Sequence, residues 1–278
     1  MRIAYASDLH GETAHYEALF SLAKEKECGA VILGGDLSPK KFSRSEIIPH
    51  HRNFYETFLL PLIERHKHER PDLKVYVIMG NDDCAPNARI FENRPDLMTW
   101  IHGKTVELEP GLLLSGYSCV DITPFYLKDW ERWDSKEPRT KVRSLKGGRS
   151  KPDGSQIEAF AFPETPCQTI EEELAPKASE LGGKDFIWVA HCPPHDSNLD
   201  KMAMGVHVGS DSIRRFIEKS APLISLHGHI HESPRMTGSF KDQIGRTLSV
   251  NAGQDWKFLH AVTFDTADPA GTIRHTRE

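Results

Sequence analysis

Residues 30–36 read AVILGGD, a β-branched apolar run that ends in two glycines and an aspartate. This pattern predicts a buried strand that leads into a loop. A similar apolar run ends at an aspartate in residues 2–8, RIAYASD, and another leads into a glycine in residues 74–82, KVYVIMGND. Helical spacing of apolar residues predicts a helix over 13–27 and a longer helical stretch, interrupted by prolines, over 44–69. Strands that alternate with helices predict an α/β fold with a largely parallel or mixed sheet.

The second half of the chain has further strand signals around a long irregular segment. Residues 105–118, TVELEPGLLLSGYS, predict two short strands around a Pro-Gly turn. Residues 121–184 are polar and irregular, with helices predicted near 125–133 and 169–181. After this segment the sequence predicts strands at 185–191 and 222–231, a helix at 209–219, and closing antiparallel strands at 246–253, 259–265 and 271–276. The sequence therefore predicts a single domain over 1–278, with an insertion at about 121–184.

The composition disfavours several classes of protein. Of the 278 residues, 38% are hydrophobic and 27% are charged, which is ordinary for a globular protein. The net charge of −5 argues against nucleic acid or an anionic membrane surface as the main partner. The sequence shows no membrane-span or signal-peptide pattern, and its five scattered cysteines are typical of reduced thiols. We therefore expect a cytoplasmic protein, and the sequence makes no prediction of its oligomeric state.

Side chains that can bind metal follow each predicted core strand at the point where the strand ends. In open α/β sheets the carboxyl ends of the strands line the crevice where ligands bind, so these side chains should converge on one site. In chain order they are Asp8 and His10, then Asp36, then Asn81, Asp82 and Asp83, then His191 and His195, and finally His227, His229 and His231.

The last group lies in LHGHIH at residues 226–231, where three histidines occupy alternate positions. Alternation along a fraying strand would place His227, His229 and His231 on one face. Mixed carboxylate, imidazole and amide ligands suit divalent first-row metals such as Mn, Fe, Ni or Zn. The carboxylate of Asp36 has two oxygens and can bridge two ions that lie about 3.5 Å apart. We therefore expect His229 and His231 to bind different ions of one pair.

The ordered set D-x-H, G-D, G-N-x-D, H and G-H-x-H runs from Asp8 to His231 and resembles the calcineurin-like metallophosphoesterase superfamily. The resemblance implies a four-layer α/β/β/α sandwich with two divalent metal ions at its rim. It also implies that a hydroxide bridging the ions attacks the phosphorus of a phosphoester in line. By motif, one ion would take Asp8, His10, Asp36 and His231, and the other would take Asp36, Asn81, His191 and His229.

The sequence departs from the superfamily pattern directly after Asn81. Many members read G-N-H-[DE], with a histidine that protonates the leaving group, whereas Asp82 stands at that position here. Asp82 could act as the acid if burial or neighbouring carboxylates raised its pKa, although two divalent ions would lower it. His195, past a Pro-Pro turn, is either a replacement acid or a loop histidine in solvent. Substrates with good leaving groups should therefore be cleaved much better than those with poor ones.

Several residues near these motifs have two interpretations. His227 either contacts the substrate phosphate or is a buried, hydrogen-bonded histidine. Cys84 and Cys192 either bind metal as thiolates or pack as thiols. Ser210 starts a predicted helix, which either binds an anion with its free amides or is simply capped by this residue. The segment NAG at residues 251–253, which begins with Asn251, resembles an Asn-x-Gly turn that has a structural role in the superfamily.

The insertion also has two interpretations. Its aromatic residues either line a lid over the metal site or pack on the domain. Its basic residues either guide an anionic substrate or belong to a solvated loop. The aromatic residues are Phe125, Tyr126, Trp130 and Trp133, and the basic residues are Lys141, Arg143, Lys146, Arg149 and Lys151.

These features favour a dinuclear metal-dependent phosphoesterase that acts on a small phosphodiester or phosphomonoester, with the diester preferred. A protein phosphatase is the weaker alternative because no arginine lies in the block around Asn81. The acidic balance of the chain disfavours a nuclease, although the basic residues of the insertion keep that hypothesis open. An alternative of another class is a non-catalytic metal-binding scaffold, against which the complete set of ligands argues.

Overall fold

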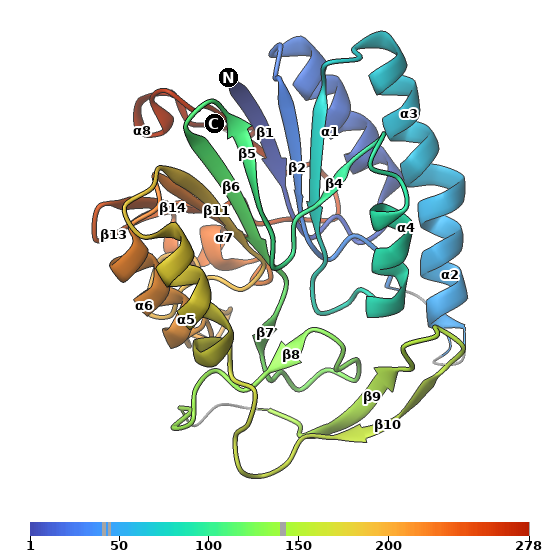
Figure 1. Cartoon of the computed structure of the whole chain (residues 1–278), viewed down its shortest axis with the longest axis vertical. Coiled ribbons are helices and arrows are strands. Elements are labelled where there is room, and N and C mark those ends of the chain that lie inside the picture. The colour runs from blue at the N-terminus through green and yellow to red at the C-terminus, as the bar shows by residue number, and fades with distance from the viewer. Residues whose placement is uncertain (41–42, 44–45, 140–142, 278) are drawn as a thin grey trace.

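Two six-stranded sheets face each other at the centre of the computed structural model, which describes residues 1–40, 43, 46–139 and 143–277 (Figure 1). The first sheet contains β1 (Arg2–Ala6), β2 (Ala30–Gly34), β3 (Lys74–Ile78), β4 (Thr99–Trp100), β15 (Val262–Asp265) and β16 (Arg274–His275), in the order β16-β15-β1-β2-β3-β4. The second contains β5 (Thr105–Glu109), β6 (Leu112–Tyr117), β11 (Phe186–Ala190), β12 (Ile224–His227), β13 (Lys241–Ile244) and β14 (Thr247–Asn251), in the order β13-β14-β12-β11-β6-β5.

Helices cover the outer face of each sheet (Figure 1). On the first sheet they are α1 (Thr13–Glu25), α2 (Ile47–Phe54), α3 (Leu60–Glu69) and α4 (Ala88–Glu92), and on the second they are α5 (Ile170–Leu181) and α6 (Asp211–Ser220). The short helices α7 (Ser233–Thr237) and α8 (Pro269–Thr272) and a 3₁₀ turn at Ala85–Asn87 complete the set. This arrangement confirms the predicted four-layer α/β/β/α sandwich.

The central strands are buried on both faces, which explains their continuous apolar sequences. In β1, Ile3 and Tyr5 belong to the core between the two sheets, together with Ile187 of β11. Ala4 and Ala6 alternate with them and belong to the core beneath the helices. Side chains with a period of two therefore fill both cores from a single strand.

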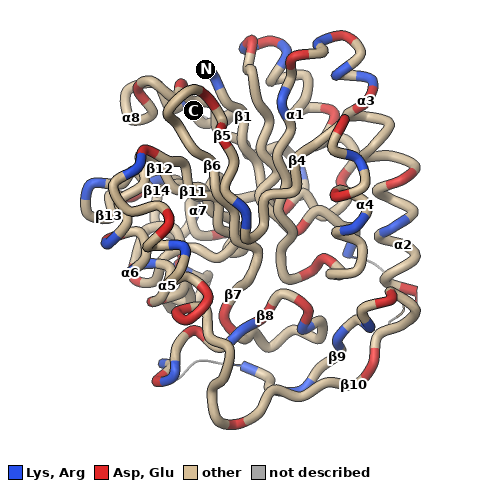
Figure 2. The backbone as a smooth tube through the Cα atoms, viewed as in Figure 1, with Lys and Arg blue, Asp and Glu red and all other residues tan. Residues whose placement is uncertain are grey.

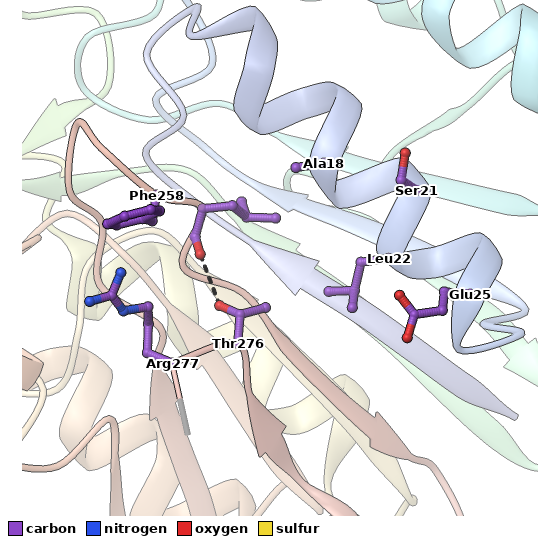
Figure 3. A pocket seen from close by; sticks show the side chains of 8 residues that line it. Ala18, Ser21, Leu22, Glu25, Phe258, Thr276 and Arg277 are labelled. Carbon is purple, nitrogen blue, oxygen red and sulfur yellow. Dashed lines mark hydrogen bonds between the residues drawn. The ribbon is translucent and has the colours of Figure 1, made fainter.

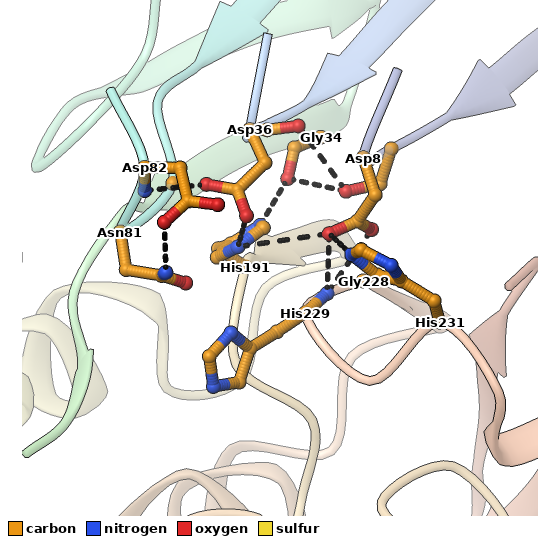
Figure 4. A network of polar contacts seen from close by, with 12 residues as sticks. Asp8, Gly34, Asp36, Asn81, Asp82, His191, Gly228, His229 and His231 are labelled. Atoms are coloured by element: carbon orange, nitrogen blue, oxygen red, sulfur yellow. Dashed lines mark hydrogen bonds and ion pairs between the residues drawn. The ribbon is translucent and has the colours of Figure 1, made fainter. Parts of the chain in front are cut away.

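The direction of the strands brings the loops that carry polar residues together. β1, β2 and β3 are parallel in the first sheet, and β11 and β12 are parallel in the second. The carboxyl ends of parallel strands meet at one edge of a sheet, and here the edges of the two sheets lie side by side. In Figure 4 the segments that follow all five strands converge on one cluster of side chains.

The long helical stretch near the N-terminus is less interrupted than its prolines predict. A π-helical turn at Tyr55–Leu59 joins α2 to α3, and the two prolines fall in the first turns of these helices. Pro49 removes no hydrogen bond, because the first amides of a helix have no partner within the helix. Pro61 follows the π-helical turn directly, and the amide of Leu60 before it donates to the carbonyl of Tyr55. Residues 44 and 45 of the predicted stretch lie outside the described residues.

The prediction for residues 121–184 is partly wrong. No helix forms over residues 125–133, which contain turns and the short strand β8 (Glu131–Arg132). This strand pairs with β7 (Val120–Asp121). A hairpin of β9 (Lys146–Ser150) and β10 (Ile157–Ala161), which the sequence did not predict, follows. The predicted helix at 169–181 is confirmed as α5, which packs beside α6 in the outer layer.

Burial of a polar pair explains why the helical spacing at residues 125–133 was misleading. Lys128 is fully buried, and its ammonium group donates to the carbonyl of Thr123 and to the carboxylate of Glu131. Trp130 packs on Trp100 of the first sheet. These tertiary contacts replace the helical hydrogen bonds that the spacing of the aromatic residues indicated.

The closing strands differ from the prediction in one respect. β15 and β16 are antiparallel to their neighbours, as predicted, but β14 runs parallel to β12. The antiparallel partner of β14 is the edge strand β13, which was not predicted. Among the described residues, none of the helices has the length and apolar character needed to cross a bilayer.

Candidate metal centre

Two overlapping groups of acidic and imidazole side chains lie where the five strands end (Figure 4). Within each group, one possible ligand atom of every residue lies within 4.8 Å of the others. The first group is Asp8, His10, Asp36 and His231, and the second is Asp36, His191 and His229. The groups share Asp36, which is the residue predicted to bridge two ions.

Asn81 lies beside the second group. Its side-chain amide donates to Asp82 at 3.0 Å, and the backbone amide of Asp82 donates to Oδ1 of Asp36 at 2.8 Å. Figure 4 shows Asn81 and Asp82 on one side of His191, with Asp8 on the other. The structure thus brings all seven predicted ligands into one cluster.

Several polar atoms of this cluster lack hydrogen-bond partners and could instead bind a divalent cation. Nε2 of His10 and Nε2 of His231 lie 3.1 Å apart. Oδ1 of Asn81 and Nδ1 of His10 are buried and have no hydrogen-bond partner within the described part of the chain. Buried polar atoms without partners are rare and call for an explanation such as an ion. Nitrogen and oxygen donors in this combination suit first-row divalent metals.

The backbone of the cluster is strained at the ligands themselves. Asp8 (φ 60°), His10 (φ 43°), Asp36 (φ 51°) and His229 (φ 65°) lie in the left-handed region. They make up half of the eight non-glycine residues with positive φ in the described chain. For residues other than glycine this conformation costs about 1–2 kcal/mol. Such strain gathers at functional sites, where the surrounding structure imposes it.

Two glycines leave the space that the carboxylates occupy. A Cβ atom at Gly80 would overlap the carboxylate of Asp36 and the ring of His191. A Cβ atom at Gly228 would overlap the carboxylate of Asp8. The glycines of the G-N-x-D and G-H-x-H motifs therefore allow the loops to approach the ligands closely.

Backbone carbonyls orient the ring of His191. Its Nδ1 donates to the carbonyl of Gly34 at 2.9 Å, so Nε2 faces Oδ2 of Asp36 at 3.4 Å. His227 also contacts the backbone on either side of His191. Its Nδ1 lies 3.0 Å from the carbonyls of Ala190 and Cys192. Hydrogen bonds of this kind fix the tautomer and direction of a metal-binding imidazole.

His227 therefore does not share a face with the two histidines that follow it. β12 ends at this residue, and its side chain is fully buried and points back into the sheet. The predicted alternation was wrong because the chain turns at His229, where φ is 65°. Of the two interpretations of His227, the structure supports the buried, hydrogen-bonded one.

Asp83 joins the two loops that carry the shared carboxylate and the amide ligand. Its carboxylate accepts hydrogen bonds from the amides of Leu37, Ser38 and Gly80. The hydroxyl of Tyr55, at the start of the π-helical turn between α2 and α3, donates to it at 3.1 Å. The last residue of G-N-x-D thus has a structural role that the sequence did not assign.

The carboxylates and imidazoles of the cluster shift one another's pKa values. Although burial raises the pKa of Asp8 and Asp36, His231 and His191 hold both pKa values well below their usual range. Burial lowers the pKa of His191, but Asp36 and Asp8 outweigh it and raise this pKa to about 10. Asp8 likewise raises the pKa of His231 against burial. Divalent cations would supply positive charge to the same carboxylates, so their binding would release the proton that His191 carries at neutral pH.

The other two histidine ligands are neutral. Burial lowers the pKa of His10 to about 3 and the pKa of His229 to about 3. A neutral imidazole is the form that binds a metal ion. These two rings are therefore ready to bind a cation without losing a proton.

A family model described as calcineurin-like phosphoesterase matches residues 1–233. The chain belongs to the calcineurin-like phosphoesterase family. Among solved structures, TT1561 of Thermus thermophilus aligns with a TM-score of 0.62 and 18% sequence identity over 99% of this chain and 97% of that chain. This likeness agrees with the four-layer fold. The family match confirms the resemblance that the sequence motifs indicated.

Two further solved structures align less closely. A dimetal phosphatase from Danio rerio has a TM-score of 0.49 and 10% identity over 95% of this chain and 91% of that chain. An archaeal phosphodiesterase has a TM-score of 0.42 and 11% identity over 99% of this chain and 98% of that chain. None of the curated proteins compared with the chain matches it.

Asp82, at the position where many members of the family have histidine, faces the metal centre from its rim. Its carboxylate lies 3.3 Å from the ammonium group of Lys40 and 3.9 Å from Nδ1 of His10. Burial and the charge of Asp36 raise the pKa of Asp82 to about 6, although Lys40 lowers it. Cations bound nearby would lower this pKa further. The role of Asp82 as an acid stays a prediction.

His195 is neither in solvent nor in either ligand group. It is buried, its Nδ1 lies 3.4 Å from Oδ2 of Asp200, and its backbone amide donates to the carbonyl of Ser210 at 3.0 Å. The solvent-exposed alternative was wrong because the loop after β11 folds back onto the start of α6. A catalytic role for His195 stays a prediction.

The N-terminus of α6 binds a side chain of the protein itself. Oγ of Ser210 accepts the amide of Ile213, and the amides of Asp211 and Ser212 donate to the carboxylate of Asp134. Asp134 occupies the position that a phosphate would take. The capping interpretation is therefore the one that the structure supports.

The cysteines next to the motifs pack as thiols. Cys84 is buried against Ile48 and Leu127, and burial raises the pKa of its thiol. Cys192 is buried in the main core. Neither belongs to a ligand group.

The insertion uses its aromatic and basic residues largely for packing. Trp130 and Trp133 are buried, although Phe125 is exposed. The guanidinium groups of Arg143 and Arg149 lie over the rings of Trp133 and Phe160, at 4.9 and 3.5 Å from their centroids. Figure 2 shows acidic residues close to basic ones around β9 and β10. Lys141 lies outside the described residues.

A surface cavity of about 740 Å³ lies away from the metal centre (Figure 3). It is lined by residues of α1, including Leu22 and Glu25, and by Phe258 and Arg277 near the C-terminus. No residue that lines it belongs to a ligand group. This cavity therefore adds nothing to the candidate site.

Proposed function

We propose that this protein is a metal-dependent phosphoester hydrolase whose centre holds two divalent cations. The observation that carries the proposal is the pair of ligand groups that share Asp36 at the carboxyl ends of four strands. Membership of the calcineurin-like phosphoesterase family supports it independently. The first cation would be held by Asp8, His10, Asp36 and His231, and the second by Asp36, Asn81, His191 and His229.

Two cations held in this way would supply Lewis acidity toward the phosphoryl group and would lower the pKa of a water molecule to near neutrality. The chain supplies the geometry. Asp36 fixes the spacing of the two positions, and the carbonyl of Gly34 keeps Nε2 of His191 directed into the centre. The backbone amide of His229 donates to both oxygens of Asp8, at 2.9 and 3.0 Å, which holds the two sheets together at the centre.

The residue after Asn81 supports a preference for esters with good leaving groups, such as aryl phosphodiesters. At the position after Asn81 the chain has Asp82, whose carboxylate is paired with Lys40. A carboxylate in an ion pair next to two cations is a poor proton donor at neutral pH. Substrates whose leaving group needs no protonation should therefore react faster than alkyl phosphomonoesters.

Hydrolysis of bis-p-nitrophenyl phosphate and p-nitrophenyl phosphate by manganese-loaded protein tests the proposal. We expect activity on at least the diester, and loss of that activity in Asp36→Asn. Asp72→Asn is the matched control, because Asp72 is an exposed aspartate outside the centre. Iron, nickel and zinc are compared in the same assay, since the donor set accepts each of them.

Elemental analysis of the same preparations separates the possible failures. The proposal predicts two bound metal ions per wild-type chain and fewer in Asp36→Asn. Wild-type protein that binds no metal and hydrolyses neither ester under any metal condition would refute it and would favour a non-catalytic scaffold. Activity that survives in Asp36→Asn would refute the assignment of the shared ligand.

A further inference from the structure

Trp256 is the exposed tryptophan of the five in the chain, and its ring lies next to a metal ligand. Its exposed fraction is 68%, whereas Trp100, Trp130, Trp133 and Trp188 are all at most 7% exposed. The ring centroids of Trp256 and His10 are 6.0 Å apart, with 35° between the planes. A large apolar ring left in water beside a polar centre has no role in the core of the protein.

Lys40 lies between Trp256 and the centre. Its ammonium group is 5.8 Å from the centroid of the Trp256 ring and 3.3 Å from the carboxylate of Asp82. About a third of its side chain, 36%, is exposed. Neither Lys40 nor Trp256 belongs to a motif, so the sequence predicts no role for either residue. Together they give one side of the centre an aromatic face and a positive charge.

The loop that carries Trp256 is tied to the centre at its base. The backbone amide of Gln254 donates to the carbonyl of His231, and its side-chain amide donates to the carbonyl of Ser7, which precedes the first aspartate ligand. Asp255 accepts the amides of residues 257 and 258 and lies 3.0 Å from the ring of His260. These bonds hold the loop, so the backbone of Trp256 is placed near the centre before any ligand binds.

We propose that Trp256 and Lys40 form a recognition subsite for phosphoesters whose alcohol carries a planar aromatic ring, such as a nucleobase. The ring of the ligand stacks on Trp256, and Lys40 supplies positive charge beside the phosphoryl group. Stacking on an aromatic side chain selects for planarity because every base has a π-face. The proposal rests on the proposed function for the position of the phosphoryl group, but not on turnover.

Binding of AMP and of ribose 5-phosphate to zinc-loaded protein, followed by calorimetry, isolates the contribution of the ring. The two ligands share the phosphate and the sugar and differ by the base. We expect wild-type protein to bind AMP about tenfold more tightly than ribose 5-phosphate. In Trp256→Ala this difference should disappear. Lys40→Met should weaken both ligands by a similar factor.

Phe258→Ala is the matched control. Phe258 is 46% exposed on the same loop, but its ring faces the guanidinium group of Arg277, 4.7 Å away, rather than the centre. This variant should keep the preference for AMP. A second readout is tryptophan emission: AMP should quench the exposed component in wild-type protein, whereas Trp256→Phe should show no such quenching. Zinc is used because its filled d shell does not interfere with emission.

Each outcome decides the proposal. Equal affinities for AMP and ribose 5-phosphate in wild-type protein, no AMP binding at all, or a preference that persists in Trp256→Ala would overturn it. Trp256 could instead form a contact between two protein chains. In that case Trp256→Ala would bind AMP as wild-type protein does but would sediment with a lower molecular mass, and this result would also overturn the proposal. A preference for AMP that depends on Trp256 supports it even if no ester is hydrolysed, in which case the proposed function alone fails.

Discussion

Asn251 is the residue whose removal tests the structural account of the centre most directly. It is fully buried at the end of β14, and its side-chain amide donates to the carbonyls of Leu199, Gly228 and Ile230 at 2.9, 3.2 and 3.1 Å. Its Oδ1 accepts the amide of Gly253 at 2.8 Å. Two of these carbonyls belong to the loop that carries the last two histidine ligands, so Asn251 fixes the shape of that loop.

The expected cost of Asn251→Ala follows from the number of bonds. The amide has two hydrogens and Oδ1 accepts one, so the side chain makes about three hydrogen bonds of full strength. A hydrogen bond contributes about 1 kcal/mol net, and a buried group left without a partner costs at least as much. We therefore expect the free energy of unfolding to fall by about 3 kcal/mol. Looser placement of His229 and His231 should also weaken metal binding by about 10- to 100-fold, as for other residues that orient ligands.

Urea unfolding in the presence of a chelator measures the first effect without a contribution from bound metal. Competition with a chromogenic zinc chelator measures the second. Asn53→Ala, on the exposed face of α2, is the control and should change stability by less than about 0.5 kcal/mol. A loss of less than about 1 kcal/mol in Asn251→Ala would refute the counting of bonds. Unchanged zinc affinity in a destabilised variant would refute the role in positioning the histidines.

Other parts of the structure give three more predictions. Burial lowers the pKa of His191, but neighbouring carboxylates outweigh it and raise this pKa from 6.5 to about 10. In protein treated with a chelator, the stability that protonated His191 contributes should be full below pH 6.5 and lost as the pH rises to 10. Midpoints of urea unfolding across this pH range measure the effect. Lys128→Met should lower stability by about 3–5 kcal/mol because it leaves the fully buried Glu131 without its partner, and thermal unfolding should show partial recovery on adding Glu131→Gln. Gly228→Ala should abolish metal binding in equilibrium dialysis, because the added Cβ overlaps the carboxylate of Asp8.

The gathering of these side chains in one cluster could be predicted from the sequence because each follows a strand with a clear signal. Runs such as AVILGG are buried on both faces, so they are apolar throughout, and the first polar residue after each run marks the edge of a sheet. Asp36 and His191 could be placed at one site without knowing which sheet each strand joins. The candidate site of this fold lies at strand ends, so a residue that follows a strand in the sequence also lies at the edge of a sheet.

Residues that act through tertiary contacts could not be predicted in this way. The alternation that grouped His227 with His229 assumes an extended chain, and nothing in the sequence shows that the backbone turns at the second of them. Helical spacing over 125–133 failed because Lys128 is satisfied by buried partners rather than by solvent. Trp256 lies next to His10 although 246 positions separate them in the sequence.

The backbone conformation of the cluster gives a further argument for the proposed binding of cations. Asp8, His10, Asp36 and His229 all have positive φ, a conformation that glycine adopts at little cost and other residues adopt at about 1–2 kcal/mol each. Glycine at these four positions would relieve the strain and would remove the repulsion between two buried carboxylates. The chain instead has a carboxylate or an imidazole at every one of them. Aspartate and histidine are among the non-glycine residues that adopt this conformation most often, and both can also bind a divalent cation. The binding of cations proposed above would offset the remaining strain.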